Sequence, residues 1–186
     1  SAITLNTNGT SVAAANYTIV SITPAAGLVA AAGNATVGDA QAASAIAADA
    51  FTNTGATALD VEYEISPISA DGCRGDTITV TLTVDPEPVL ANNLSATICS
   101  DVPSGIMLAT DGSSAAVAGY TIVSIALDPG LVAAAGNAAT GANQSANAIA
   151  ADEFTNTSGG ILFVRYEISP VSTDGCLGDT TIVTLA

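Results

Sequence analysis

The chain of 186 residues contains no histidine, no lysine and no tryptophan, and its only basic residues are Arg74 and Arg165. Without histidine, the usual Ser/His/Asp and Cys/His nucleophile arrangements cannot form and the common zinc ligand sets are incomplete. Seventeen acidic residues give a formal net charge of −15, which repels a phosphate backbone. No apolar run approaches the length of a membrane-spanning helix. These absences exclude nucleic acid as a partner and argue against membrane insertion.

Catalytic groupings of other kinds are also sparse. Glu62 and Glu64 form a carboxylate pair of the type used in glycoside hydrolysis, but strand alternation places both on a solvated face. No glycine-rich phosphate loop follows a strand in the required way. We therefore expect a chain that is not an enzyme and that binds no cofactor.

An internal repeat organises the sequence. A constant offset aligns Cys73 with Cys176 without gaps, and more than half of the aligned residues are identical. Such similarity is typical of a tandem array, and each copy is long enough to bury a core of its own. The equivalent of the opening strand 94–99 of the second copy would precede Ser1, so we expect an upstream segment or a neighbour to supply it. We predict two domains and a semi-rigid linker with prolines between them, at residues 1–84, 92–186 and 85–91 respectively.

The clearest local pattern is a repeated hairpin. Val61, Tyr63 and Ile65 alternate with acidic residues, which is the period of a half-buried strand. After a turn rich in glycine and aspartate, threonine alternates with apolar residues over 78–84. The same pattern returns over 164–185.

Two alanine-rich windows, 28–51 and 131–154, are ambiguous between helix and strand. Alanine favours a helix, but glycines and scattered Asn, Thr and Ser residues interrupt a helical stripe, and Ile46, Ala48 and Ala50 alternate towards Phe51. The pattern favours strand and loop, with a helix as the alternative.

These features together resemble a known family. The Phe51–Thr54 run, the strand with Tyr63, the Asp71–Asp76 turn and the Asp85–Pro88 exit are similar to PKD-like repeats of large secreted surface proteins of Bacteroidota. The resemblance covers nearly the whole chain, twice. It implies an all-β fold of two tandem immunoglobulin-like sandwiches and an extracellular or cell-surface location, and it implies no activity.

From the resemblance we expect a structural repeat of a surface filament, stalk or adhesin that self-associates through its sandwiches. Two alternatives are an adhesin module that binds a glycan or a protein, and an accessory module of an exported hydrolase. The lack of tryptophan gives glycan binding little support, because aromatic platforms are usual for sugars.

The resemblance also bears on the three cysteines. An extracellular setting favours disulfides. In an immunoglobulin-like sandwich the first strand starts at the pole that holds the loop between the last two strands, and this arrangement implies a disulfide between Cys99 and Cys176. Cys73 is then free, or joined to a neighbouring segment.

The turns carry two kinds of candidate site. Thr77 and Thr180 each follow an aspartate in a short pattern that resembles the O-glycosylation motif of exported Bacteroidota proteins, although so short a pattern also occurs by chance. Four aspartates either form simple Asp-Gly turns or offer hard oxygen ligands to a weak calcium site: Asp71, Asp76, Asp174 and Asp179.

The last candidate is an assembly surface. Three outward positions are polar in the first copy and apolar in the second, where they are Phe163, Leu177 and Ile182. Contiguous apolar patches tend to mark contacts, whereas single exposed apolar residues are common. We predict that Phe163 and Ile182 pack against another repeat, and that this heterologous contact propagates an open filament.

Overall fold

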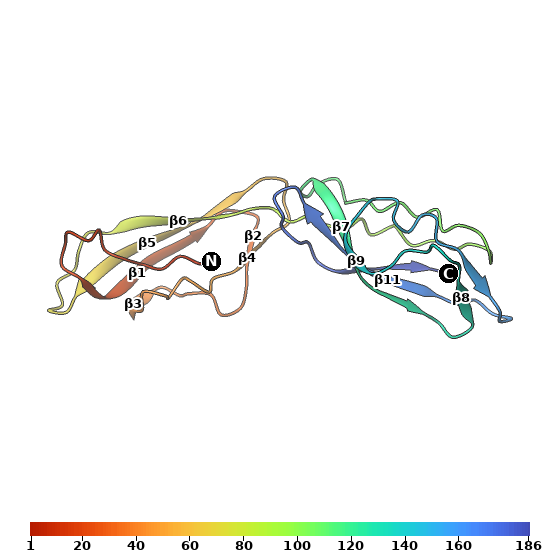
Figure 1. Ribbon diagram of the computed structural model, residues 1–186. Helices are drawn as coiled ribbons and strands as arrows, with labels where there is room; N and C mark the ends of the chain where they lie inside the picture. The colour runs from red at the N-terminus through yellow and green to blue at the C-terminus, as the bar shows by residue number, and fades with distance from the viewer. The chain divides into compact units, whose positions relative to one another are not determined.

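The computed structural model describes residues 1–186, which form strands, turns and loops (Figure 1). The chain divides into two compact units, the first comprising residues 1–53 and 57–85 and the second principally residues 86–186. Both units are all-β and sandwich-like, as predicted. The alanine-rich windows contain short strands and turns, which confirms the strand-and-loop interpretation. No helix is present that could span a membrane.

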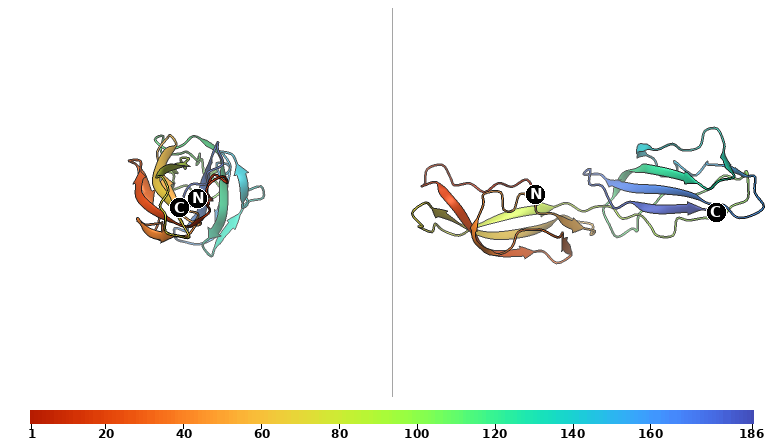
Figure 2. Two further views of the ribbon diagram at one scale, coloured as in Figure 1. Left: turned by 90° about the vertical axis from the view of Figure 1, so that its left-hand side faces the viewer. Right: turned by 90° about the horizontal axis from the view of Figure 1, so that it is seen from below.

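The first unit contains six strands, which are β1 (Ala14–Pro24), β2 (Leu28–Ala30), β3 (Gly38–Gln41), β4 (Phe51–Asn53), β5 (Leu59–Ser69) and β6 (Ile78–Val84). Four of them form an antiparallel sheet in the order β3-β1-β5-β6, and β2 pairs with β4 in a separate ribbon. The right-hand view of Figure 2 shows the long strands of this sheet lying side by side.

Strands β5 and β6 form the predicted hairpin, with Val61 opposite Leu82. The turn is tight because the Ser69 carbonyl accepts the amide of Gly72. Gly72 has a φ of 79°, a conformation that residues with a side chain rarely adopt. The period-two pattern and the Asp-Gly dipeptide together therefore predict this element correctly.

The second unit repeats the architecture with β7 (Val117–Leu127), β8 (Leu131–Ala133), β9 (Gly141–Gln144), β10 (Phe154–Asn156), β11 (Val164–Ser172) and β12 (Thr181–Leu185). Its main sheet has the order β12-β11-β7-β9, and β8 pairs with β10.

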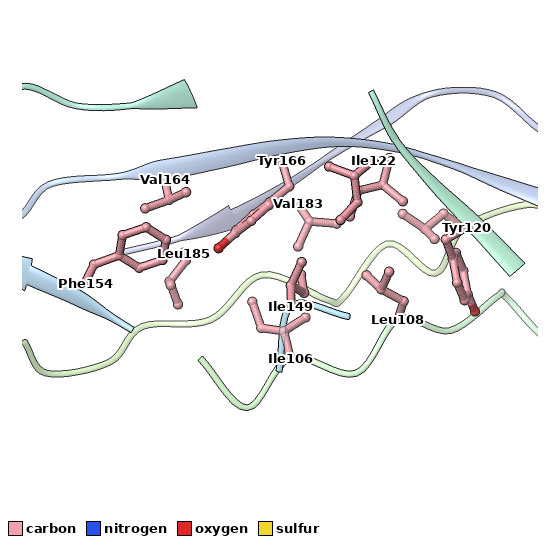
Figure 3. Packing of buried hydrophobic residues seen from close by; sticks show 12 residues of the cluster. Ile106, Leu108, Tyr120, Ile122, Ile149, Phe154, Val164, Tyr166, Val183 and Leu185 are labelled. Atoms are coloured by element: carbon pink, nitrogen blue, oxygen red, sulfur yellow. The ribbon is translucent and has the colours of Figure 1, made fainter. Parts of the chain in front are cut away.

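The core of the second unit lies between this sheet and an opposing layer of irregular segments. Val164 and Tyr166 of β11 lie on the side of the sheet that faces the segments carrying Ile106 and Ile149, and all four belong to one core (Figure 3). Residues 145–152 form consecutive tight turns, in which backbone amides donate to carbonyls three residues earlier.

The equivalent turns in the first unit correct one expectation. Residues 46–50 do not alternate as a strand, because the amide of Asp49 donates to the carbonyl of Ile46 within a turn. Ile46 is fully buried from that turn. Consecutive turns here place one apolar side chain each into the core. Such turns and a strand in which Ile alternates with Ala give the same sequence pattern, so the sequence alone does not distinguish them.

The second unit begins within the predicted linker. Val89 and Ala91 make backbone hydrogen bonds with residues 109–111. Leu90, which lies between them, is only 4% exposed and belongs to the core. The predicted linker at 85–91 is therefore too long at its C-terminal end. Its prolines suggested a connection between domains, but the burial of Leu90 places residues 89–91 in the second unit.

From Leu90 the chain continues along the edge of β12. Ala96 forms a parallel bridge with Leu185, and the amide of Ile98 donates to the carbonyl of Ala186 at 2.9 Å. We call residues 88–98 the leading segment. It replaces the regular opening strand predicted at 94–99, and its apolar residues Leu94, Ala96 and Ile98 pack against the core.

Candidate functional site

The predicted assembly residues lie apart on the second unit. Ile182 is 55% exposed on the outer face of β12, opposite Glu167, and Leu177 is exposed in the loop between β11 and β12. Phe163 is half-buried just before β11, about 13 Å along that strand from Glu167. The three side chains do not form a contiguous patch, because Arg165 and Glu167 separate Phe163 from Ile182.

Polar contacts fix the surroundings of Phe163. The guanidinium of Arg165 lies 5.3 Å from the centre of its ring, within the range of a cation–π contact. Arg165 Nη1 also donates to Asp128 Oδ1 at 2.7 Å, and the Phe163 amide donates to Asp128 Oδ2 at 3.0 Å. These two hydrogen bonds, that of Arg165 first, hold the pKa of Asp128 below its usual value. The ring is therefore held between a charged network and solvent.

The aspartates of the hairpin turns show no calcium cage. Asp71 and Asp76 are both exposed, and the turn that carries them is closed by its own backbone bonds, including one from Gly75 to Pro67. No group of three or more His, Cys, Asp or Glu side chains is placed to hold a metal ion. The geometry fits the simple Asp-Gly turn.

In the second unit Asp179 lies near Glu87 and not in a ligand cluster. Burial raises the pKa of the Glu87 carboxyl, and the charge of Asp179 adds to the effect. Asp174 is exposed in the same turn.

The two candidate glycosylation sites have the same geometry. Thr77 Oγ1 lies 2.7 Å from Ser66 Oγ, and Thr180 Oγ1 lies 2.6 Å from Ser169 Oγ. Both threonines are exposed and both serines are buried. The threonine side chains are therefore reachable from solvent while a hydrogen bond fixes their rotamer.

The predicted disulfide is wrong, since Cys73, Cys99 and Cys176 are all free thiols. Cys176 precedes β12, whereas Cys99 follows the residue that bonds to Ala186 beyond the end of β12. The leading segment runs parallel to β12, so the two cysteines lie near opposite ends of that strand. Their separation is roughly 20 Å or more, against a Cα separation of about 6 Å in a disulfide.

The reason for the error is the position at which the leading segment starts. It does begin at the pole of the loop between β11 and β12, where Gly178 packs against the carbonyl of Pro88. Cys99 lies at the far end of the segment, because the chain enters the sandwich earlier than the linker prediction allowed.

Two buried Tyr–Asp pairs were not predicted from the sequence. Tyr63 donates its hydroxyl to Asp49 at 2.7 Å, and Tyr166 donates to Asp152 at 2.8 Å. Both carboxylates are 2% exposed, and each also accepts a backbone amide, from Ala35 in the first unit. Burial, followed by the hydrogen bond and charge of the aspartate, raises the pKa of both tyrosines. The equal spacing of Tyr and Asp in the two copies is the only signal in the sequence.

A groove of about 610 Å³ on the first unit was also missed. It opens between residues 6–14 and the loop that joins β5 to β6, and Val12 and Ile78 line it. These two side chains are 74% and 55% exposed. Strand β6 lies at the edge of its sheet, and no strand pairs with its outer side. Predicted site residues Asp71, Cys73 and Asp76 also line this groove.

A sequence model of the PKD-like domain matches residues 25–88 and 96–186. These two segments cover most of both units. No curated protein and no solved structure matches the chain significantly.

Proposed function

Because the chain belongs to the PKD-like domain family, whose members are typically extracellular structural or adhesion repeats, we propose that it is a non-catalytic structural repeat of a surface filament, stalk or adhesin. Duplication is the observation that carries this proposal. Two units of the same strand order, each with its own core, stand in one chain. Repetition of a self-contained unit extends an array and multiplies contact surfaces, without adding chemistry.

The polar interior supports a structural role. Asp49 and Asp152 are the least exposed carboxylates of the chain. Their oxygens accept hydrogen bonds from tyrosine hydroxyls and backbone amides. A carboxylate closed off in this way stabilises a fold and is not presented to a substrate. An extracellular or cell-surface location, with O-glycans on Thr77 and Thr180, forms part of the same proposal.

Self-association is proposed to use Phe163 and Ile182 as two separate contact points on the second unit. The double variant Phe163→Asp/Ile182→Thr should shorten or abolish assemblies seen by negative-stain microscopy and sedimentation velocity, with circular dichroism unchanged. A matched control is Met107→Asp/Val132→Thr, which changes two exposed apolar residues of the same unit, 62% and 56% exposed.

Two results would count against the assembly surface: unchanged assemblies in the Phe163/Ile182 variant, or equal loss in the control. A chain that forms only monodisperse particles at every concentration would favour the alternative of a ligand-binding adhesin module.

A further inference from the structure

The groove on the first unit and the leading segment of the second unit occupy equivalent positions. The offset between the copies maps groove residues Asn6–Asn8 onto Ala109–Asp111, which pair with Val89–Ala91 in the second unit. It also maps Gly75 onto Gly178, where any side chain would overlap the carbonyl of Pro88. The first unit thus has an open groove where the second unit holds an extended strand.

Burial differs between the units at positions that adjoin the leading segment, next to Ser114, which accepts the amide of Val89, and at Leu185, which bridges Ala96. Val12 is 74% exposed, whereas its equivalent, Ala115, is 5% exposed. Leu82 of β6 is half-buried, whereas its equivalent, Leu185, is 2% exposed. The first unit therefore presents apolar surface that the same fold buries when a strand is present, and its burial is favourable by about 25 cal/mol per Å².

The backbone of β6 offers matching hydrogen-bond partners. In the second unit the amides of Ala96 and Ile98 donate to the carbonyls of Thr184 and Ala186. The equivalent carbonyls belong to Thr81 and Thr83, on the outer edge of β6 where no strand pairs. An unpaired edge of this kind is a template for strand addition.

We propose that the groove and the outer edge of β6 form an acceptor site for an extended strand with the pattern of the leading segment, supplied by a neighbouring repeat of the same kind. The strand runs parallel to β6 and places residues equivalent to Leu90, Leu94, Ala96 and Ile98 towards the core of the first unit.

Recognition of this occupant rests on its apolar residues and backbone, and not on charge. Arg74 lines the groove and is the only basic residue of the first unit, but Asp71 and Asp76 line it as well. In the second unit burial and the charge of Asp179, the equivalent of Asp76, raise the pKa of Glu87, so the acidic start of such a strand gains no net attraction there. The acceptor site follows from the equivalence of the two units, and it would serve an adhesin as well as a filament.

The test uses the full chain and a fluorescent peptide of residues 85–99 with Cys99→Ser. Fluorescence anisotropy should show saturable binding of one peptide per chain, and hydrogen–deuterium exchange should show new protection in β6 and at Asn6–Asn8. Val12→Asp should weaken binding at least about tenfold. The matched control Val29→Asp, at a residue that is 65% exposed and outside the groove, should bind normally.

A peptide that also carries Leu90→Asp and Ala96→Asp should not bind. The proposal is overturned if the unmodified peptide fails to bind, if the aspartate peptide binds equally well, or if protection is confined to residues 109–111 and β12, which would mean exchange with the leading segment of the second unit. None of these results depends on Phe163 or Ile182, so failure of the acceptor site and failure of the proposed assembly surface are separate outcomes.

Discussion

Asp49 and Asp152 lie inside the two cores without a basic partner, since the one ion pair of the chain joins Arg165 to Asp128 on the surface. Burial of an unpaired charge is costly. Each carboxylate accepts hydrogen bonds from a tyrosine hydroxyl and a backbone amide, and these bonds offset the cost. A hydrogen bond to a charged group contributes about 1.5–3 kcal/mol. At the scale of the residue, these pairs tie the turn segments of one layer to the central strand of the other.

Removal of one hydroxyl tests this interpretation. Tyr166→Phe should lower the free energy of unfolding of the second unit by about 2 kcal/mol, because Asp152 loses a donor while remaining buried. Urea unfolding followed by circular dichroism measures the change. Tyr120→Phe is the control: Tyr120 is 3% exposed in the same core, and its hydroxyl makes no hydrogen bond to an aspartate. An equal loss in both variants would show that the Tyr–Asp bond contributes nothing specific.

The same pairs predict a dependence on alkaline pH. Burial and the neighbouring aspartates raise the pKa of Tyr63 and Tyr166 in the folded chain, while an unfolded tyrosine ionises near pH 10. The folded state therefore keeps protons that the unfolded state releases. The stability contributed by the pairs should be complete below about pH 10 and fall as the pH rises above it. Unfolding free energies at a series of pH values from neutral to alkaline measure the slope, which should flatten in the double variant Tyr63→Phe/Tyr166→Phe.

At the scale of the element, the hairpins were predictable and the leading segment was not. Val61, Tyr63 and Ile65 alternate strictly because one face of β5 is buried, and the sequence records that directly. Leu90 stands among prolines with no period around it, and its burial depends on residues 106–122, which are distant in sequence. Local patterns reveal contacts between adjacent strands. They do not reveal which edge strand an irregular segment will cover. Without that information the groove was not predicted, and the cysteine pairing was predicted wrongly.

Truncation of Leu90 tests whether this residue belongs to the core of the second unit and not to a linker. Leu90→Ala should destabilise the second unit by about 2–4 kcal/mol, as expected for truncation of a buried leucine. Met107→Ala, at a residue that is 62% exposed, should change stability by less than about 0.5 kcal/mol. If Leu90→Ala were as neutral as this control, residue 90 would belong to a linker after all.

The cysteines should react as separate thiols. In the native chain, a thiol reagent should modify exposed Cys73 and Cys99 quickly and half-buried Cys176 more slowly. Mass spectrometry after proteolysis under non-reducing conditions should show no peptide that joins Cys99 to Cys176 within one chain. Recovery of that linked peptide from folded monomer would contradict the parallel course of the leading segment along β12.

At the scale of the whole molecule, a net charge of −15 opposes association between copies. The screening length falls from about 30 Å at 0.01 M salt to about 8 Å at 0.15 M. Assembly should therefore increase with sodium chloride over this range and on acidification towards the pKa of the carboxylates, near 4. Light scattering across salt and pH checks the expectation. Assemblies that dissolve as salt rises would indicate contacts held by ion pairs, for which the chain has only two basic residues.

The parallel course of the leading segment along β12 also determines how the second unit carries load. Tension applied at Pro86 and Ala186 pulls two neighbouring parallel strands in opposite directions along their length. This tension loads two hydrogen bonds in shear simultaneously, the one from Ala96 to Thr184 and the one from Ile98 to Ala186. Antiparallel end strands pulled from one edge would instead open one bond after another. A unit built in this way resists extension by sharing force across its edge, which suits a module exposed to pulling.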